Sequence, residues 1–479
     1  MPVMPVMLAL HWRRALLSGV LSAGMALLVV LIAPFGNMLS LAPVGVAAFG
    51  TLAPLVIERH CQQGPWLRPI TWALLMFGVV LVVVPLTCVF AGFRTGVLPF
   101  LPSDRFLNTA SLLYATAFTA FAIAQLRTSP KAVVLAVPST ALVRLAAVYT
   151  VLGILGVWFA FGSPQGIADY VRNPAVYLLL RSLDDSQNVQ GLVANVLRPF
   201  FIVGAVAGWG AWRVHRASGT SRWERVSVLV AVVTGIIFVG ATFNLNRNSI
   251  VVPLVAFAAA YMWTDGVVRA WLVGAAVAAV ACGAVLVGQV RSVTSLAQDG
   301  SLLGNGLLSD DLLAAMQVYG GGPQYLGFLL ESSAFEGVPF LGSTLLSSVL
   351  FPVPVLGKPW RETSGVALYN QLIYGDSSVA DQIIPFLGEL FINFHLVGVL
   401  LGFYYLGRVV LWLDVSLAKS RDLLGRYLFM YFGAWASFLI LGSVAGVSQI
   451  LVYFCWPLYG LALVSHVVRA PVDLMERAG

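Results

Sequence analysis

Long apolar runs separated by short polar connections dominate the chain from end to end. A bilayer hydrocarbon core about 30 Å thick is crossed by roughly 20 apolar residues in helical conformation. About 12 runs approach that length, so we expect an all-α, polytopic integral membrane protein, because helices satisfy their own backbone hydrogen bonds in lipid. The predicted spans are 15–33, 39–57, 70–91, 107–126, 143–162, 191–212, 226–243, 249–264, 269–288, 386–413, 427–446 and 450–468.

The composition agrees with this pattern, because 59% of residues are hydrophobic, 10% are charged and the mean hydropathy is +0.90. A soluble domain carries about 25% charged residues. With the N-terminus inside, about two thirds of the 27 Lys and Arg residues fall on the inner side, which favours N-in, C-in orientation. The net charge of +7 then reflects membrane orientation, and we expect no nucleic-acid partner.

One connection, 289–383 on the predicted outer side, is far longer than the others. It divides the chain into 1–288 with nine spans, 289–383, and 384–479 with three spans. Segments such as "PQYLGFLLESSAF" and "GSTLLSSVLFPVPVLGKPW" are apolar pieces punctuated by Gly and Pro, which predicts a cap of short re-entrant and interfacial helices. No inner loop is large enough for a nucleotide-binding domain, and no G-x-x-x-x-G-K-[ST] motif occurs, so an ATP-driven pump is not expected.

The basic residues of the outer side are nearly all Arg, which suits bidentate contacts to phosphate or carboxylate. Arg198 lies several residues inside its predicted span, where a cation has a functional role or snorkels to the headgroups. The turn "NLNRNS" presents Asn244, Asn246 and Arg247, which suit sugar hydroxyls and phosphate oxygens. The alternative is a polar turn with an interfacial anchor. Arg291 leaves the next outer helix end and is expected nearby.

The stretch "GELFINFHLVGVLLG" begins the tenth predicted span with groups that lipid disfavours. Helical periodicity places Glu389 and Asn393 on one face and His395, Gly398 and Gly402 on the opposite one. The two glycines form a G-x-x-x-G motif, which lets another helix approach closely. Glu389 either forms a structural ion pair with an outer Arg or belongs to a site. His395 is either an interhelical hydrogen-bonding group or a catalyst.

These residues resemble the bacterial oligosaccharide repeat-unit polymerases, the O-antigen polymerase (Wzy-type) family. That family has a Pro-x-Pro…Lys-Pro segment late in its large periplasmic loop and a Gly-Glu-aromatic-x-Asn-Phe-Gly-x-x-Gly entry into the next helix. His395 is a departure, since the family often has Gly there. The matching residues are Pro352, Pro354, Lys358, Pro359, Gly388, Glu389, Asn393, Phe394 and Gly398.

The resemblance implies a glycosyltransferase of the bacterial inner membrane whose active site faces the periplasm. It would join undecaprenyl-pyrophosphate-linked oligosaccharides, transferring the growing chain to each new unit with the lipid pyrophosphate as leaving group. Membrane lipids and a chain-length regulator protein are the other implied partners. No cofactor is expected, and no metal, since the outer segments lack convincing ligand spacing. The product is left open between lipopolysaccharide O-antigen, capsule and exopolysaccharide.

This chemistry needs cations for the leaving group and a base, or strict positioning, for the acceptor hydroxyl. The candidate bases are Glu389, Asp381, Asp376 and Glu336, followed by His395. The candidate substrate contacts are Arg247, Arg291, Arg198, Arg361, Lys358, Asn244, Asn246, Asn393 and Tyr325.

Two other functions fit a chain of this kind. An O-antigen ligase also has about 12 spans and a large outer loop, and transfers finished glycan to a lipid acceptor. A transporter or flippase of lipid-linked oligosaccharide predicts deep charges and broken helices arranged in repeats. Few charges lie deep in the predicted spans, and no halves repeat, which favours the polymerase.

Overall fold

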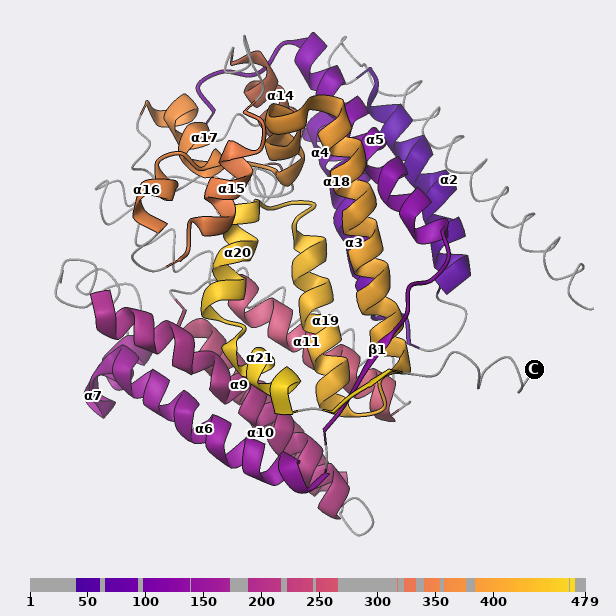
Figure 1. Ribbon diagram of the computed structural model, residues 1–479. Coiled ribbons are helices and arrows are strands. Elements are labelled where there is room, and N and C mark those ends of the chain that lie inside the picture. The colour runs from indigo at the N-terminus through magenta and orange to yellow at the C-terminus, as the bar shows by residue number, and fades with distance from the viewer. Residues whose placement is uncertain are drawn as a thin grey trace, which may run out of the picture. The chain divides into compact units, whose positions relative to one another are not determined.

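In the computed structural model the described part of the chain is predominantly α-helical (Figure 1). Within it, seven helices are long and apolar enough to cross a membrane, or eight if one bent pair forms a single span. The multi-pass membrane class expected from the sequence is therefore confirmed for these residues. The structure describes residues 40–60, 65–93, 98–137, 139–172, 188–216, 222–243, 247–265, 317, 323–332, 340–353, 357–375, 384–464 and 466–469.

The chain divides into two compact units, and each is described by itself. The first unit consists of Met1–Lys131, Gly306–Val415 and Gly433–Gln449. The second consists of Ala132–Asn305, Ser416–Phe432 and Ile450–Gly479. The large predicted loop, 289–383, thus has most of its length in the same unit as the first spans, and not in a unit of its own.

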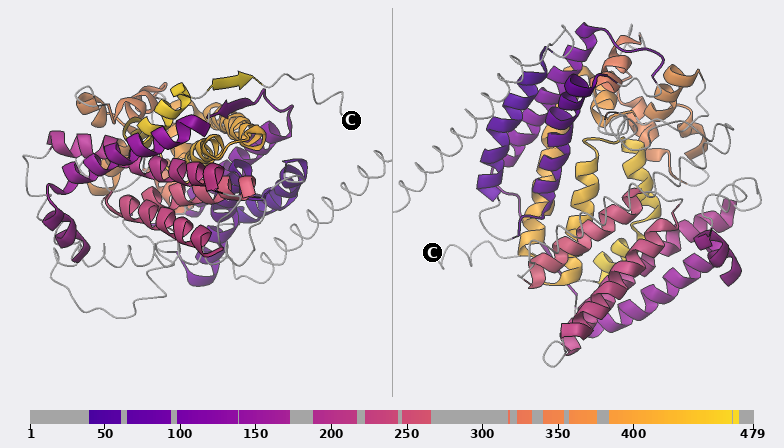
Figure 2. Two further views of the ribbon diagram at one scale, coloured as in Figure 1. Left: turned by 90° about the horizontal axis from the view of Figure 1, so that it is seen from below. Right: turned by 180° about the vertical axis from the view of Figure 1, so that it is seen from behind.

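In the first unit, α2 (Ala42–His60) packs beside α5 (Asp104–Leu126), as Figures 1 and 2 both show. A second apolar run forms α3 (Pro69–Gly78), the π-helical segment η1 (Val79–Val83) and α4 (Val84–Ala91). Pro85 lies at the start of α4 and has no N–H to donate to the preceding turn. This missing hydrogen bond accounts for the locally wider π turn within one otherwise continuous helical span.

The described part of the large loop contains four short helices, as the sequence predicts. α14 and α17 are packed into the apolar core of the spanning helices: Phe328 and Tyr369 are fully buried in the same cluster as Phe77, Phe118 and Phe403. The loop helices therefore share their core with the membrane helices. They are α14 (Pro323–Glu331), α15 (Ser343–Leu350), α16 (Gly357–Arg361) and α17 (Gly365–Tyr374).

The tenth predicted span, α18 (Phe386–Lys419), is broken at His395, whose φ of 52° and ψ of −148° are not helical. A short segment, 386–394, turns sharply into the long segment 396–419 (Figure 1). The expectation that the glycine motif receives another helix is wrong. A Cβ on Gly398 would lie 2.6 Å from the carbonyl oxygen of Leu390, and one on Gly402 would collide with the Leu390 side chain. The glycines therefore let α18 pack against its own beginning.

The last two predicted spans have different boundaries in the structure. α19 (Leu423–Phe438) ends before residue 446, α20 (Val444–Tyr453) begins after a short break, and α21 (Trp456–Val464) follows at 59° to α20. The Ser443 hydroxyl accepts a 3.1 Å hydrogen bond from the Gly446 N–H and so starts α20. Pro457, at the second position of α21, is suited to a helix start.

The predicted span 249–264 lies in the helix α11 (Arg247–Asp265), whose apolar part, Asn248–Thr264, is shorter than the seven long spans. The predicted spans 15–33 and 269–288 lie outside the described residues. The total of about 12 spans, and their orientation, therefore stay predictions.

The second unit contains α6 (Ser139–Phe161), α7 (Pro164–Arg172), α9 (Asn188–Arg216) and α10 (Arg222–Ala241). Figures 1 and 2 show α6, α9 and α10 lying side by side. Gly153 and Gly156 of α6 lie directly against the backbone of α9, at Phe201 and Arg198, so any side chain there would collide. Small residues allow this close approach of two membrane helices.

Besides its helices, the second unit contains a short two-stranded antiparallel sheet. β1 (Val133–Ala136) pairs with β2 (His466–Arg469), with Val133 opposite Arg469 and Ala136 opposite His466. The two segments flank spans, and their β-branched residues suit extended backbone. The sheet joins the segment that follows α5 to the end of the described chain.

Candidate functional site

Glu389 lies on the short segment 386–394 of α18, and its side chain is completely buried. The Ser348 hydroxyl of α15 donates a hydrogen bond to Oε1, and the Val444 N–H at the start of α20 donates one of 3.3 Å to Oε2. The N–H groups of a first helical turn have no partner within their helix, so a carboxyl group there satisfies one of them. Glu389 therefore ties α18 to both α15 and α20.

Helix α17 also meets this carboxyl group. A Cβ on Gly365, the first residue of α17, would lie 2.7 Å from Glu389 Oε1, so the backbone of α17 approaches as closely as glycine permits. The carboxyl group is thus enclosed by three helices besides its own. The ion pair with an outer Arg that the sequence left open is not among the contacts of Glu389 in the described residues.

Asn393, one turn further along, is also completely buried on the same face as Glu389. Its Nδ2 donates 2.6 Å and 2.7 Å hydrogen bonds to Thr344 Oγ1 and to the Glu389 carbonyl oxygen, and its Oδ1 accepts one of 2.9 Å from the Gly342 N–H. Gly342 has a φ of 90°, which glycine adopts without strain. The predicted polar face of this segment is therefore confirmed, and its partners are the turn into α15 and α15 itself.

His395 has an exposed side chain and a strained backbone. Its φ of 52° with ψ of −148° lies near a region that is essentially confined to glycine. Its ring contacts the Phe391 ring edge-to-face, with centroids 5.6 Å apart. The chain just before the break is held in place, because the Phe340 N–H donates a 3.2 Å hydrogen bond to the Ile392 carbonyl oxygen. The surrounding contacts thus impose the turn at a residue that resists it.

Replacing His395 with glycine is expected to increase the free energy of unfolding by about 1–3 kcal/mol, because the strain at this φ is released. Chemical denaturation in mixed micelles measures this value. His395→Ala is the matched control, since alanine removes the ring but keeps the Cβ that causes the strain. Equal stabilities of the two variants would contradict a strained backbone at this residue.

Arg198 of α9 is buried in the second unit, at the C-terminal end of α10. It donates hydrogen bonds to the Thr242 carbonyl oxygen, to Thr242 Oγ1 (3.2 Å), to the Ala194 carbonyl oxygen (3.2 Å) and to Asn195 Oδ1. Its guanidinium carbon lies 4.1 Å from the centroid of the Phe243 ring. Cations satisfy the last carbonyls of helices and are favoured there by the helix dipole. This geometry gives Arg198 a positioning role for the turn after α10.

Tyr170 of α7 supports the same turn, since its hydroxyl donates a 2.6 Å hydrogen bond to the Ala241 carbonyl oxygen. Burial raises the pKa of Tyr170 to about 12, an effect that the nearby Arg198 partly opposes. The hydroxyl therefore stays protonated and able to donate at neutral pH. Tyr170 and Arg198 together fix the chain just before the segment that carries Asn244, Asn246 and Arg247.

The other candidate substrate contacts differ in whether their side chains are described and in whether they are exposed. Arg247 begins α11, and Lys358 belongs to α16, but their side chains lie outside the described set. Arg361, at the end of α16, is exposed, and its guanidinium carbon lies 5.5 Å from the centroid of the Phe351 ring. Tyr325 is buried in the apolar core, where its carbonyl oxygen accepts a 3.0 Å hydrogen bond from the Tyr369 hydroxyl. Its ring is thus part of the core and is not presented to a ligand.

The remaining candidates lie outside the described residues and cannot be placed in the structure. They are Arg291, Asn244, Asn246, Asp376, Asp381 and Glu336.

Among the described residues, no group of three or more His, Cys, Asp or Glu side chains is arranged to hold a metal ion.

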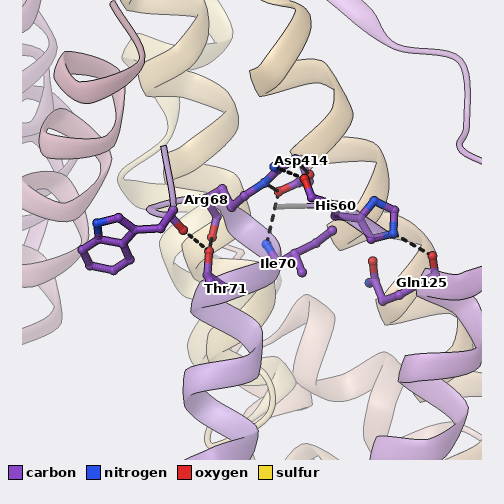
Figure 3. A network of polar contacts seen from close by, with 7 residues as sticks. His60, Arg68, Ile70, Thr71, Gln125 and Asp414 are labelled. Carbon is purple, nitrogen blue, oxygen red and sulfur yellow. Dashed lines mark hydrogen bonds and ion pairs between the residues drawn. The ribbon is translucent and has the colours of Figure 1, made fainter. Parts of the chain in front are cut away.

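Sequence reasoning missed a buried ion pair in the first unit (Figure 3). Arg68, just before α3, forms two hydrogen bonds with Asp414 of α18, one of them 2.7 Å long from Nε to Oδ1, and both side chains are almost fully buried. The Ile70 N–H also approaches Asp414 Oδ1, at 3.4 Å. Asp414 directly follows the predicted span 386–413, so an acid at the end of an apolar run was the available signal.

Neighbouring side chains extend this ion pair into a network. His60 Nε2 is 2.8 Å from the Gln125 carbonyl oxygen, and Gln125 Nε2 donates a 2.7 Å hydrogen bond to the Gly407 carbonyl oxygen. Arg408 donates one of 2.8 Å to the Thr128 carbonyl oxygen. Ends of α2, α3 and α5 are thus joined to α18 or to one another by hydrogen bonds of buried and half-buried side chains.

Comparison with protein-family models, with curated proteins and with solved structures finds no match for this chain.

Proposed function

We propose that this protein is a polysaccharide polymerase that joins lipid-linked oligosaccharide repeat units at the outer face of the bacterial inner membrane. The observation that carries the proposal is the fixed start of the segment between α10 and α11. Buried Arg198 and Tyr170 hold its first residues, and Arg247 begins a 19-residue helix at its end. A helix whose first residue is an Arg suits anions such as the pyrophosphate of a polyprenyl carrier.

We propose that the fixed end of α10 preorganises the segment that carries Arg247. A cation that is already in place when negative charge develops on a leaving group stabilises the transition state without further rearrangement. Arg247 is proposed to contact the carrier pyrophosphate, while Arg198 positions the turn. Arg291, Arg361 and Lys358 are proposed as further contacts with the pyrophosphate or with anionic sugars.

The first unit supports the proposal through the way its loop helices are held. Glu389 and Asn393 fasten α15 and α20 to the start of α18 through buried hydrogen bonds. Transfer between two bound oligosaccharides requires that they be held in a fixed relative geometry, and a rigid frame of this kind serves that purpose. Glu389 and Asn393 are proposed as positioning residues. The base remains proposed among Asp376, Asp381 and Glu336.

Replacing Arg247 with alanine is expected to abolish the ladder of chain lengths when the variant is expressed in a strain that lacks the gene and its surface polysaccharide is run on a gel. Arg247→Lys keeps the charge but loses the bidentate geometry, so partial polymerisation is expected. Arg225→Ala, at the opposite end of α10, is the matched control and is expected to give a normal ladder. A normal ladder from Arg247→Ala at wild-type membrane levels would overturn the role of Arg247.

The lipid-linked intermediates that accumulate on gene deletion separate the polymerase from its alternatives. Single repeat units on the carrier, outside the inner membrane, are expected for a missing polymerase. Long glycan on the carrier would indicate an O-antigen ligase. Carrier-linked units retained on the cytoplasmic side would indicate a transporter or flippase.

A further inference from the structure

Helix α15 buries polar residues and exposes apolar ones, which is the reverse of a helix at a water-covered surface. Its buried residues are Thr344, Ser347 and Ser348, whereas the side chains of Leu346 and Val349 are 52% and 49% exposed. A surface helix in water turns its apolar stripe to the core and its polar residues outward. The outer face of α15 is therefore built for an apolar environment.

The inward polar residues of α15 all have partners within the protein. Ser348 donates its hydroxyl to Glu389, Thr344 accepts a hydrogen bond from Asn393, and the hydroxyl of Ser347 lies 2.9 Å from that of Thr363. Buried polar groups require such partners. Because these contacts fix the rotation of α15 about its axis, Leu346 and Val349 are directed outward by the hydrogen bonds on the opposite face.

The exposed face of α15 continues onto an exposed apolar face of α18. Leu341, in the turn before α15, is 71% exposed, and a Cβ on the neighbouring Gly342 would lie 3.0 Å from the Phe394 ring. Phe394 is itself exposed and starts an exposed apolar stripe along the long segment of α18. The residues of this stripe are Leu396, Val397, Leu400, Leu401, Tyr405 and Val409.

We propose that α15 is a re-entrant helix at the membrane surface. Its exposed face, formed by Leu346 and Val349 together with Leu341 of the preceding turn, contacts the acyl chains of the bilayer. Exposure of a continuous apolar surface of this kind to water is unfavourable in free energy. Contact with lipid acyl chains avoids that free-energy cost. Lipid contact also requires that backbone groups be bonded internally, and the Leu346 and Phe351 N–H groups donate to the Gly342 and Ser347 carbonyl oxygens.

The C-terminal end of α15 fits the same placement. Arg361 is exposed and donates a 3.4 Å hydrogen bond to the Phe351 carbonyl oxygen while its guanidinium lies over the Phe351 ring. An exposed Arg whose guanidinium lies over an aromatic ring is suited to the level of the lipid headgroups. The lipid contact goes beyond the polymerase activity and does not depend on it.

The test uses nitroxide spin labels in the full chain, reconstituted in phosphatidylcholine vesicles after Cys61, Cys88, Cys282 and Cys455 are replaced by serine. Labels are attached to Leu346→Cys and, separately, to Val349→Cys. Leu401→Cys on the exposed side of α18 is the lipid control. Glu362→Cys, exposed in the turn after α16, is the water control. Collision rates with oxygen and with a water-soluble nickel chelate are measured by power saturation.

Labels on residues 346 and 349 are expected to behave like the label on residue 401, with a several-fold higher ratio of oxygen to nickel collisions than residue 362. Both side chains are about half exposed, and monodisperse elution in detergent checks that each labelled variant folds. Nickel collisions as frequent as at residue 362 would place the face in water. Protection from both reagents would show that protein covers it. Either result overturns the proposal.

Discussion

Replacing Asp414 with alanine is expected to lower the free energy of unfolding by about 3–5 kcal/mol, because the change leaves a buried cation without its partner. Arg68 is only 4% exposed and forms two hydrogen bonds with this carboxylate. Denaturant titration in mixed micelles measures the loss, and the amount of protein in the membrane is expected to fall with it. The exposed Glu362→Ala serves as the control, with a change below about 0.5 kcal/mol.

The double variant Arg68→Met, Asp414→Leu separates the penalty of an unpaired charge from the contribution of the pair. Replacement of a buried ion pair by apolar residues of similar volume is often neutral or stabilising. Most of the stability lost in Asp414→Ala is therefore expected to return in the double variant. A double variant as unstable as Asp414→Ala would instead assign the loss to packing around α18 and contradict the electrostatic explanation.

Replacing Glu389 with alanine is expected to lower the free energy of unfolding by about 2–5 kcal/mol. The Ser348 hydroxyl and the Val444 N–H each lose a buried acceptor, and a cavity remains. Glu389→Gln keeps the volume. Its amide oxygen can accept from Val444 while its NH₂ group donates to the Ser348 hydroxyl, which is both donor and acceptor. Glu389→Gln is therefore expected to lower the free energy of unfolding by only about 1 kcal/mol.

The same pair of variants distinguishes a positioning role from catalysis. A positioning residue predicts that Glu389→Gln retains the ladder of polysaccharide chain lengths, whereas Glu389→Ala loses it. A general base predicts that Glu389→Gln loses the ladder although the protein stays folded, because an amide accepts no proton at neutral pH. Loss of the ladder in a stable Glu389→Gln variant would thus return Glu389 to the catalytic candidates.

The sequence alone predicted the class of protein and several local features, because these depend on composition and helical periodicity. Spans of adequate length appear as α2, α5, α6, α9 and α10 at nearly the predicted positions. The short loop helices were predicted from Gly and Pro punctuation, and the shared face of Glu389 and Asn393 from a rotation of about 100° per residue. None of these inferences needs knowledge of which elements pack together.

The failures occur where a long-range contact decides the local structure. The break of α18 at His395 has no Gly or Pro at that residue to signal it. It is imposed by the hydrogen bond from Phe340 to Ile392 and by the packing of Leu390 on Gly402. The glycine motif was recognised, but a sequence pattern does not say which segment fills a small-residue surface. The β1–β2 pair was missed because strand pairing across the length of the chain has no local signal.

The sequence by itself therefore determined that this chain is a helical multi-pass membrane protein with a polar face at the start of α18. It also supplied the candidate anion-binding side chains, which stay predictions. Only the tertiary structure decided that Glu389 and Asn393 hold α15 and α20, that Arg198 fixes a turn, and that Arg68 pairs with Asp414. The physical reason is that hydropathy and periodicity act along one helix, whereas a buried polar group takes its role from whichever distant partner satisfies it.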